Sequence, residues 1–342
     1  MVPSKLKVWR ALVPALALLT LAPSAHAWGS TGHRLIGVCA IKALPAEFPA
    51  FLRDPSAAAL IGEVGREPDR SRGAGQPHDA DLDPGHFINV GDDGKIGGGP
   101  ALASLPKTRA LYETALRQAG TDSGKVGYLP YVIAEGWEQL TKDFAYYRVD
   151  AYGQDHAASP ADADWFRKDM LLREMLVLRD LGYWSHFVGD AGQPMHDSVH
   201  YNAWGDYPDA AAFTKARIHL PFEGEFVRRY VSEADVCSAM TPTRAVDPDP
   251  LVEAAGFIEA NRALVRPLFA LWTAGGFSQE TPAQGKAFAQ ARLSAAASEL
   301  RDLVIAAWTA SNTATVGYPA VKVADILSGA VPLPIQALQG LD

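Results

Sequence analysis

The longest regular pattern in the chain is the helical spacing of apolar residues between Ala163 and Asp190. The residues that set this spacing are Leu171, Leu172, Met175, Leu176 and Leu178. Apolar positions that recur at the period of a helix bring their side chains to one face, so the pattern predicts one strong helix. No strand–helix–strand alternation occurs, and no glycine-rich phosphate loop follows a strand pattern. The chain is therefore predicted to be all-α.

Shorter patterns of the same kind predict the remaining helices and the domain. These helices are expected at 34–44, 107–119, 129–147, 222–233, 251–274 and 284–310, with Thr31 placed to cap the first. Two polar stretches, 62–100 and 198–217, are expected to form long loops at one end of the helices, and long loops in compact domains are usually functional. The tail from Ala320 is expected to dock as an irregular segment. Residues 28–342 are predicted to form a single multi-helix domain.

The first 27 residues have the three parts of a secretory signal peptide. A basic stretch at 5–10 precedes an apolar run at 11–21, and a small-residue cleavage site, Ala25-His26-Ala27, follows. The apolar run is shorter than the ~20 residues that span a membrane. Residues 1–27 are therefore predicted to be removed on export to the periplasm or the medium. Trp28 then becomes the first residue and carries a free α-amine.

Charge and cysteine content narrow the functional classes. The formal net charge is −8 at pH 7, and loss of the basic leader makes the mature chain more acidic still. An acidic chain is poorly suited to nonspecific capture of nucleic acid, although bound metal cations would reverse the field locally. Cys39 and Cys237 form either one long-range disulfide in an exported chain or two buried thiols. Neither belongs to a cysteine-based zinc motif.

The densest chemical signal is the segment from His186 to His196. His186 and Asp190 stand four residues apart, so on a helix they share one face and both reach one metal ion. Gly192 and Pro194 are expected to break the helix and to turn His196 back toward the same place. Histidine with carboxylate and no thiolate suits zinc in a hydrolytic site. A satisfied core histidine beside a surface acid is the alternative.

Weaker signals add further candidate ligands. His219 and Glu223 repeat the four-residue spacing, and Pro221 fits the first turn of a helix that begins there. Asp69 and His86 lie in the 62–100 stretch, and loops of this kind can deliver ligands to one site. The alternative for each loop residue is an ordinary solvated side chain.

The new terminus is the last candidate, in the sequence Trp28-Gly-Ser-Thr-Gly-His33. An α-amine with a pKa near ~8 can lose its proton and bind a metal through nitrogen. The carbonyl of Trp28 could close the chelate, and His33 lies one short turn away. The alternative is a frayed terminus.

As an ordered set, these residues resemble the superfamily of zinc-dependent phospholipases C and single-strand nucleases of the P-one/S-one type. The resemblance runs from Trp28 to Glu223, which is most of the mature chain. It implies a mainly helical fold, phospholipase C/nuclease-like, that binds three zinc ions per chain. Its ligand set would be Asp69, His86, His186 and Asp190 for one zinc, then His196, His219 and Glu223 for a second, and Trp28, His33 and a bridging Asp190 for the third.

The resemblance also implies a role for one carboxylate and for the metals. Zinc lowers the pKa of a bound water toward ~7, which supplies a nucleophile for in-line attack on phosphorus. Asp69 is the carboxylate that would orient or deprotonate this water. Metal ligands must be deprotonated, so activity is expected to fall in acid. The resemblance gives no role to His78, His156 or His200, which are expected to be structural or superficial.

Features that bear on the substrate point in different directions. The step from Trp28 to His33 resembles the nuclease branch, whereas Glu223 resembles the phospholipase branch. Phe87, next to a ligand, is a candidate for stacking on a nucleobase. Asn89 is the second candidate for substrate contact, although nucleases tend to carry Asp there. The aromatic loop 200–207 suits a base, a lipid surface or a choline headgroup.

The predicted function is that of a secreted zinc-dependent phosphodiesterase of the nuclease or nucleotidase kind. Its expected substrates are single-stranded nucleic acids or nucleotides. Phospholipase C activity on phospholipid headgroups is the alternative. A third hypothesis is an exported zinc-binding protein without catalysis. The sequence indicates no obligate protein partner.

Overall fold

The computed structural model describes residues 28–72 and 75–340, so the predicted signal peptide at 1–27 lies outside the described residues. Within them the fold is a single all-α domain, which confirms the predicted fold class, and one two-stranded antiparallel sheet joins β1 to β2. In chain order the elements are α1 (Gly29–Lys42), α2 (Ala50–Arg53), α3 (Pro55–Val64), α4 (Glu67–Ser71), α5 (Asp79–Leu82), η1 (Asp83–His86), η2 (Leu102–Ser104), α6 (Arg109–Gln118), α7 (Ser123–Val126), α8 (Leu129–His156), α9 (Pro160–Asp190), η3 (Pro194–Asp197), η4 (Pro221–Phe226), α10 (Val227–Tyr230), α11 (Glu233–Ser238), α12 (Pro250–Arg262), α13 (Val265–Thr273), α14 (Ala283–Ser311), β1 (Thr315–Val316), β2 (Val321–Lys322), α15 (Val323–Leu327) and α16 (Ile335–Gln339).

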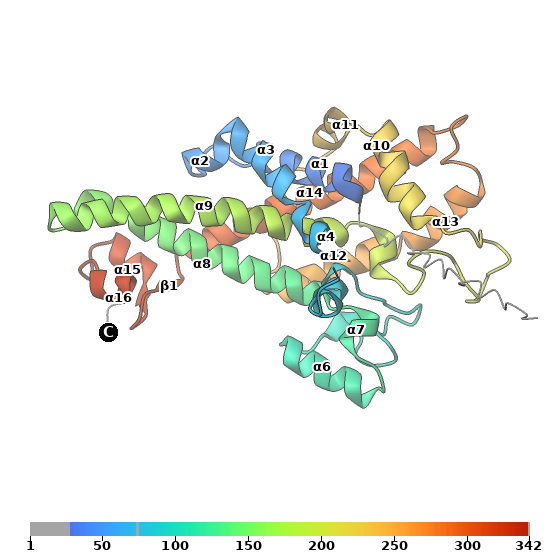
Figure 1. The fold of residues 1–342 in the computed structure, drawn as a ribbon, viewed down its shortest axis with the longest axis horizontal. Helices are drawn as coiled ribbons and strands as arrows, with labels where there is room; N and C mark the ends of the chain where they lie inside the picture. Colours follow the sequence, from blue (N-terminus) through green and yellow to red (C-terminus); the bar gives the residue numbers. More distant parts are fainter. Residues whose placement is uncertain (1–27, 73–74, 341–342) are drawn as a thin grey trace, which may run out of the picture.

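Two long helices, α8 and α9, form a hairpin that runs along the molecule (Figure 1). The hydroxyl of Ser159 caps α9 by accepting a hydrogen bond from the backbone N–H of Asp162. Glycine allows the two helices to approach closely, because a Cβ at Gly136 of α8 would lie 2.0 Å from the ring of Trp184 on α9. Helices α1, α3 and α14 pack against this hairpin and complete the main hydrophobic core.

Several predicted helix boundaries are wrong, for identifiable reasons. The first helix begins at Gly29, so Thr31 lies inside it and does not cap it. The predicted helix 251–274 is divided into α12 and α13, because Pro267 lacks the N–H that would bond the carbonyl of Ala263. The predicted helix 222–233 starts as the π-helical turn η4 and ends at Tyr230.

Two predicted irregular regions contain regular structure. The stretch 62–100 includes the short helices α4, α5 and η1, so it is not one long loop. The tail from Ala320 forms β2, α15 and α16, with β2 paired to β1. In Figure 1 these C-terminal elements lie against the hairpin, where Val323 and Ile326 join Val149 and Phe166 in a small second core.

The apolar pattern of α9 predicted the helix correctly but does not mark its buried face. Leu171, Leu172 and Met175 are exposed, whereas Phe166 and Trp184 are buried against α8. Helical periodicity identifies a face that shares a chemical character, and it does not identify which neighbour covers that face. In this part of the molecule the covered face is the one that meets α8.

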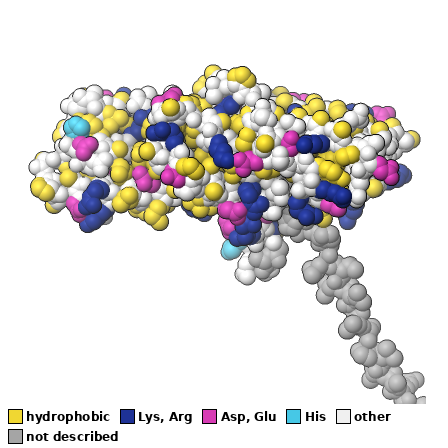
Figure 2. Space-filling model, turned by 90° about the horizontal axis from the view of Figure 1, so that it is seen from above, with side chains coloured by type: hydrophobic (Ala, Val, Ile, Leu, Met, Phe, Trp, Pro, Cys, Tyr) yellow, Lys and Arg dark blue, Asp and Glu magenta, His cyan; other side chains and the backbone are white. Residues whose placement is uncertain are grey.

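The two cysteines are joined in the structure. A disulfide links Cys39 of α1 to Cys237 of α11, across 198 residues of sequence, which decides between the two alternatives that the sequence left open. No helix among the described residues has the length and apolar character of a membrane span. Figure 2 shows charged side chains of both signs scattered over one face, with apolar side chains between them and few histidines.

Candidate metal centre

Side chains from six elements meet at the end of α9. The helix carries His186 and Asp190 one turn apart in its last turns and ends directly after Asp190. Gly192 and Pro194 follow, and Pro194 opens the 3-10 turn η3 that carries His196. The helix break that the sequence predicts is therefore present. The other contributors are His33 of α1, Asp69 of α4, His86 of η1, and His219 and Glu223 at η4.

The first group of side chains is centred on His186. Its Nε2 lies 2.9 Å from His86 Nδ1 and 3.3 Å from Asp190 Oδ2. Asp190 Oδ2 is also 3.1 Å from His86 Nδ1. Asp69 Oδ1 lies 3.8 Å from His186 Nε2 and approaches from the more exposed side. Asp69, His86 and His186 together form a group whose ligand atoms are close enough to hold one metal ion.

The second group joins the turn after α9 to the segment around η4. His196 Nε2 lies 3.1 Å from His219 Nε2, and His219 Nε2 lies 2.7 Å from Glu223 Oε2. All three side chains are buried, and their ligand atoms again form a group that could hold a metal ion. The four-residue spacing of His219 and Glu223 brings both onto the same face of this segment.

A third group surrounds the other oxygen of Asp190. His33 Nε2 lies 3.5 Å from Asp190 Oδ1, and the ring of His33 stacks on the ring of His186 at 3.8 Å. A Cβ on Gly189 would lie 3.0 Å from His33 Nδ1, a tight contact, so glycine favours this approach. Asp190 thus faces two groups, one through each carboxylate oxygen.

Trp28 is buried beside this third group. Its indole Nε1 donates a hydrogen bond to the carbonyl oxygen of Gly189 at 2.8 Å, and its ring lies 5.5 Å from the ring of Phe222. These contacts attach the start of α1 to the residue before Asp190 and to the residue before Glu223. The bulky side chain therefore anchors the predicted mature terminus next to the metal groups.

Backbone carbonyls fix the tautomers of three histidines. Nδ1 of His186 lies 2.8 Å from the oxygen of Gly65, Nδ1 of His196 lies 2.6 Å from that of His86, and Nδ1 of His219 lies 2.5 Å from that of Tyr201. A carbonyl oxygen only accepts, so each Nδ1 donates a proton and each neutral ring presents a lone pair at Nε2. The lone pairs of His196 and His219 therefore face each other and a carboxylate, an arrangement that a bound cation stabilises.

Buried oxygens in the same place lack hydrogen-bond donors. Asp190 Oδ1 and Glu223 Oε1 accept no hydrogen bond from the described residues. A buried carboxylate oxygen without a donor is costly, and metal coordination removes that cost. The donor set of imidazole nitrogens and carboxylate oxygens, without thiolate, fits zinc.

The electrostatics of the groups agree with this donor set. Burial, followed by the charge of Arg72, lowers the pKa of His86 well below its usual value, and burial does the same to His186. Burial and the charge of Asp69 raise the pKa of Asp190. At Glu223 burial acts in the same direction, but His219 and His196 outweigh it and lower the pKa. His86 and His186 are therefore neutral near pH 7, as metal ligands must be.

A cavity of about 350 Å³ opens beside the second group. It is lined by Arg72, Phe87, Asn89, Lys125, Met195, His196, Tyr201 and His219. The cavity thus contains both residues that the sequence suggested for substrate contact, Phe87 and Asn89. The side-chain N–H of Asn89 donates to the carbonyl of Lys125 at 3.0 Å, while its buried Oδ1 accepts no hydrogen bond from the described residues.

Sequence reasoning missed Arg72, Lys125 and Gln193. Arg72 follows α4, and its guanidinium lies 3.5 Å from Asp69, so a cation three residues after a candidate ligand was the available signal. Lys125 comes from α7, and no pattern in the sequence indicated that it would lie at the site. Gln193 is fully buried, and its amide N–H donates to Glu223 Oε2 at 3.0 Å while its Oε1 accepts from the N–H of Met195 at 2.8 Å.

The three other histidines among the described residues lie outside the metal groups. His78 is exposed, and His156 is exposed and stacks on Tyr152 at the far end of the hairpin. His200 is buried, where its ring stacks on Trp204 at 3.8 Å and its Nε2 lies 3.1 Å from Asp92. It therefore ties the 198–217 segment to the residues after His86.

Comparisons with known proteins add little to this description. No protein-family model matches the chain, and no curated protein matches its sequence. Among solved structures, it is similar to an alpha toxin from Clostridium absonum, with a TM-score of 0.40 and 13% sequence identity over 84% of this chain and 65% of that chain. The chain thus spans slightly less than two thirds of the toxin's length. A likeness this distant carries no functional argument, so we infer function from the geometry of the site.

Proposed function

We propose that this protein is an exported zinc-dependent phosphodiesterase that hydrolyses P–O bonds in single-stranded nucleic acids or nucleotides. The observation that carries the proposal is the meeting of lone-pair nitrogens at buried carboxylates. His196 and His219, each held in one tautomer by a backbone carbonyl, face Glu223 without any cationic side chain among them. Such a set has the chemistry of a metal site and lacks the chemistry of an ordinary hydrogen-bonded core.

We further propose three zinc ions per chain. Asp69, His86, His186 and Asp190 would hold one, His196, His219 and Glu223 a second, and His33 with Asp190 and the terminal amine and carbonyl of Trp28 the third. Bound there, zinc supplies Lewis-acid chemistry: it makes water more acidic and neutralises phosphate oxygens. An open coordination position for water is typical of catalytic zinc sites and unlike closed structural ones.

The chain's own residues account for the remaining steps. The guanidinium of Arg72 lines the cavity next to Asp69 and can donate hydrogen bonds to the non-bridging oxygens of a phosphate. Asp69 lies at the more exposed edge of its group, where its carboxylate can accept the proton of an attacking water. A new bond joins the water oxygen to phosphorus as the bond to the leaving oxygen breaks, and solvent protonates the leaving oxygen.

The cavity favours a nucleoside over a choline headgroup as the organic part of the substrate. Asn89 lines the cavity, and a side-chain amide can pair with the polar edge of a nucleobase but not with a quaternary ammonium. Lys125 also lines the cavity, and its positive charge repels a cationic headgroup. Phe87 and Tyr201 provide aromatic faces for base stacking.

The decisive experiment is a paired assay of zinc-loaded mature protein. One substrate is a single-stranded oligonucleotide and the other is phosphatidylcholine vesicles, with zinc content measured on the same sample. We expect cleavage of the oligonucleotide alone and about three zinc atoms per chain. Release of phosphocholine alone would transfer the proposal to phospholipase C. Protein that binds less than one zinc and cleaves neither substrate would overturn the metal-dependent function.

Export and the terminal ligand can be tested together. The disulfide between Cys39 and Cys237 is suited to an oxidising compartment, which supports export. We expect the protein purified after secretion to begin at Trp28, as read by mass spectrometry of the intact chain. One extra residue before Trp28 should lower the zinc content by about one atom because the α-amine is then displaced. Unchanged zinc content would show that the terminal amine is not a zinc ligand.

A further inference from the structure

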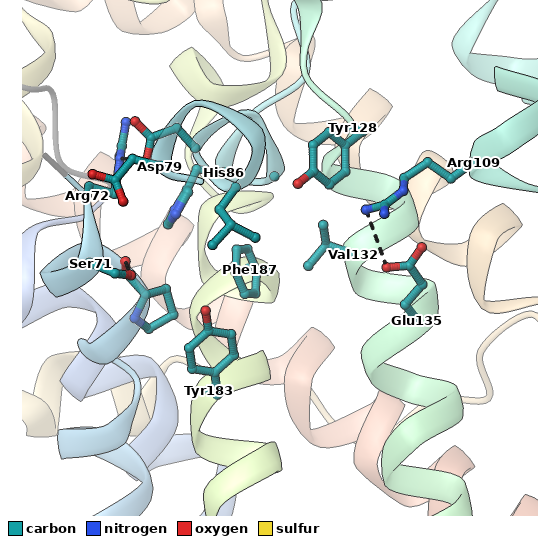
Figure 3. A pocket seen from close by; sticks show the side chains of 14 residues that line it. Ser71, Arg72, Asp79, His86, Arg109, Tyr128, Val132, Glu135, Tyr183 and Phe187 are labelled. Carbon is teal, nitrogen blue, oxygen red and sulfur yellow. Dashed lines mark hydrogen bonds and ion pairs between the residues drawn. The ribbon is translucent and has the colours of Figure 1, made fainter. Parts of the chain in front are cut away.

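Two cavities in the described part of the chain share a volume of about 150 Å³ and have aromatic rings in their walls. The first lies beside the metal centre, where Figure 3 shows Tyr128 next to Arg109, which pairs with Glu135. Arg109 lies 4.9 Å from the ring of Tyr128, and Arg179 lies 4.9 Å from that of Tyr183. The tyrosine faces of this cavity are therefore already approached by cations of the chain itself.

The other cavity lies where the end of α13 and the turn after it meet η4 and α10. Four aromatic residues line it, which we call the aromatic cluster: Phe226, Tyr230, Trp272 and Phe277. The ring centroids are 5.1 Å apart for Trp272 and Phe277, 5.0 Å for Phe277 and Phe226, and 4.7 Å for Phe226 and Tyr230. The four rings thus form one continuous aromatic wall.

A close approach to α14 holds this wall in place. A Cβ on Gly285 of α14 would lie 2.6 Å from the ring of Phe277 and 2.9 Å from that of Phe226, so glycine lets both rings rest on the helix. The backbone N–H of Gly285 also donates to the carbonyl of Gly276 at 2.9 Å. Both α10 and α13 pack on α14 (Figure 1). The aromatic wall is therefore formed before any ligand binds.

The faces of this wall suit an organic cation. Among the described residues no arginine or lysine lies over Phe226, Trp272 or Phe277, and only the exposed Arg229 approaches Tyr230, at 5.4 Å. Aromatic faces attract a quaternary ammonium group, whose methyl groups also bury apolar surface. A cavity of about 150 Å³ holds a group of roughly benzene size, and a trimethylammonium group is comparable.

The rim of the cavity carries one charge of each sign. Glu225 and Arg229 both line it and are exposed, and neither forms an ion pair among the described residues. The carboxylate of Glu225 attracts a cation, whereas the guanidinium of Arg229 repels it and attracts an anionic group. A ligand that carries both charges satisfies both side chains.

We propose that this cavity binds a small zwitterion that carries a trimethylammonium group and an acidic group, the chemistry of a betaine or of phosphocholine. The trimethylammonium group lies against the aromatic cluster near Glu225, and the acidic group lies beside Arg229. The site is separate from the metal centre, because no candidate metal ligand lines the cavity. The bound zwitterion is therefore a ligand and not a substrate, and the inference goes beyond the proposed function.

The test compares glycine betaine with 3,3-dimethylbutanoate, which has the same shape and carries a carbon in place of the charged nitrogen. Isothermal titration of the zinc-loaded mature protein measures both affinities. We expect glycine betaine to bind at least about tenfold more tightly, because only a cation is attracted to the ring faces. Equal affinities would show an apolar cavity without a cation site and would overturn the proposal. Failure of glycine betaine to bind at millimolar concentration would overturn it as well.

Variants assign the two ends of the ligand. Trp272→Leu keeps an apolar wall and should weaken glycine betaine about tenfold while leaving 3,3-dimethylbutanoate unchanged. Arg229→Gln should weaken glycine betaine but not tetramethylammonium, which has no acidic group. Arg228→Gln removes an exposed arginine that does not line the cavity and should change neither affinity. Circular dichroism checks that each variant is folded. Equal losses for both ligands in Arg229→Gln would overturn the zwitterion.

Vesicles identify the source of the zwitterion. Retention of the protein on phosphatidylcholine vesicles but not on phosphatidylglycerol vesicles, abolished by Trp272→Leu, would assign the site to a lipid headgroup. Binding of glycine betaine without retention on either vesicle would assign it to a free zwitterion. Both results support the site. No measurement here depends on cleavage, so the binding result stands even if the proposed phosphodiesterase activity is absent.

Discussion

Carboxylates are buried in two places along the α8–α9 hairpin, one of which also includes a residue of η4, and the two places differ in what surrounds them. At the metal centre, Asp190 and Glu223 lie among histidine nitrogens. Farther along the hairpin, Asp143 and Asp150 of α8 are fully buried near Asp169 and Asp180 of α9. We call these four residues the hairpin acid cluster. Among the described residues, only the first place offers groups with the geometry of a metal site.

In the hairpin acid cluster an arginine, a side-chain amide and bound protons, and not histidines, compensate the buried carboxylates. Arg173 lies 3.3 Å from Asp169 and 4.0 Å from Asp143, and the amide of Gln139 donates to both Asp143 and Asp180. Burial, then the charge of Asp169, raises the pKa of Asp150 to about 8, and burial raises that of Asp143 to about 6. Asp150 therefore holds a proton near pH 7, whereas at the metal centre the adjacent lone pairs favour a cation.

The largest expected effect comes from matched Asp→Asn substitutions in the two places. Asp190→Asn should lower kcat about 1000-fold and remove two zinc ions, because Asp190 faces two metal groups. Asp150→Asn, equally buried on the same hairpin, should change neither kcat nor zinc content by more than about twofold. Elemental analysis and turnover on an oligonucleotide measure both. Comparable zinc loss in the two variants would erase the distinction between the two places.

His196→Ala sharpens the prediction for Asp190. His196 belongs to one metal group, so its removal should release mainly one zinc ion, while Asp190→Ala should release two. Equal zinc loss in the two variants would show that Asp190 does not bridge. Zinc stoichiometry after gel filtration is sufficient to decide, and it does not depend on any activity.

An intermediate effect is expected at Gln193. This side chain donates to Glu223 and accepts from the turn that carries His196, so it positions two members of one group. Gln193→Met should weaken the binding of one zinc about 10- to 100-fold, the usual effect of losing a hydrogen bond to a ligand. Titration with a competing chelator measures this. The same loss in a Glu223→Gln background would mean that Gln193 acts through the fold and not through Glu223.

The two places also differ in how far the sequence could predict them. His186, Asp190, His219 and Glu223 carry a local four-residue spacing, so their convergence at one site could be proposed from the chain alone. The hairpin acid cluster has no such sign, because its members meet only when α8 packs on α9. Lys125 was missed for the same reason, because tertiary packing alone brings it to the cavity beside the second metal group.

Prediction of the fold from the sequence has the same limit, because tertiary packing is not written in local patterns. Periodicity predicted the long helices, yet the exposure of Leu171 and Met175 depends on which face α8 covers. Two of the wrong helix boundaries could have been predicted from the sequence. Pro267 marks the break between α12 and α13. The Ser232–Asp235 spacing is that of a capping box, which begins α11 and ends the preceding helix early.

The smallest expected effect is the part of the pH dependence of stability that Asp150 of the hairpin acid cluster contributes. The pKa of Asp150 is raised from 3.8 to about 8 in the folded chain, so the folded state binds its proton more tightly than the unfolded state. This stabilisation is complete below about pH 4 and is lost progressively as pH rises to about 8. Asp150→Asn does not titrate, so its unfolding free energy should fall less over this range.

The relevant measurement is urea unfolding of zinc-free wild type and Asp150→Asn at pH 5, 7 and 9. Zinc-free protein is used so that metal release does not add its own pH dependence. We expect the variant to gain about 1–2 kcal/mol on the wild type between pH 5 and pH 9, the range for a buried group that loses its compensation. A difference that stays constant with pH would mean that Asp150 is ionised throughout. Arg173 and its neighbours would then compensate a carboxylate charge in the hairpin acid cluster, and the contrast with the metal centre would lie only in the kind of cation, a guanidinium in place of a metal ion.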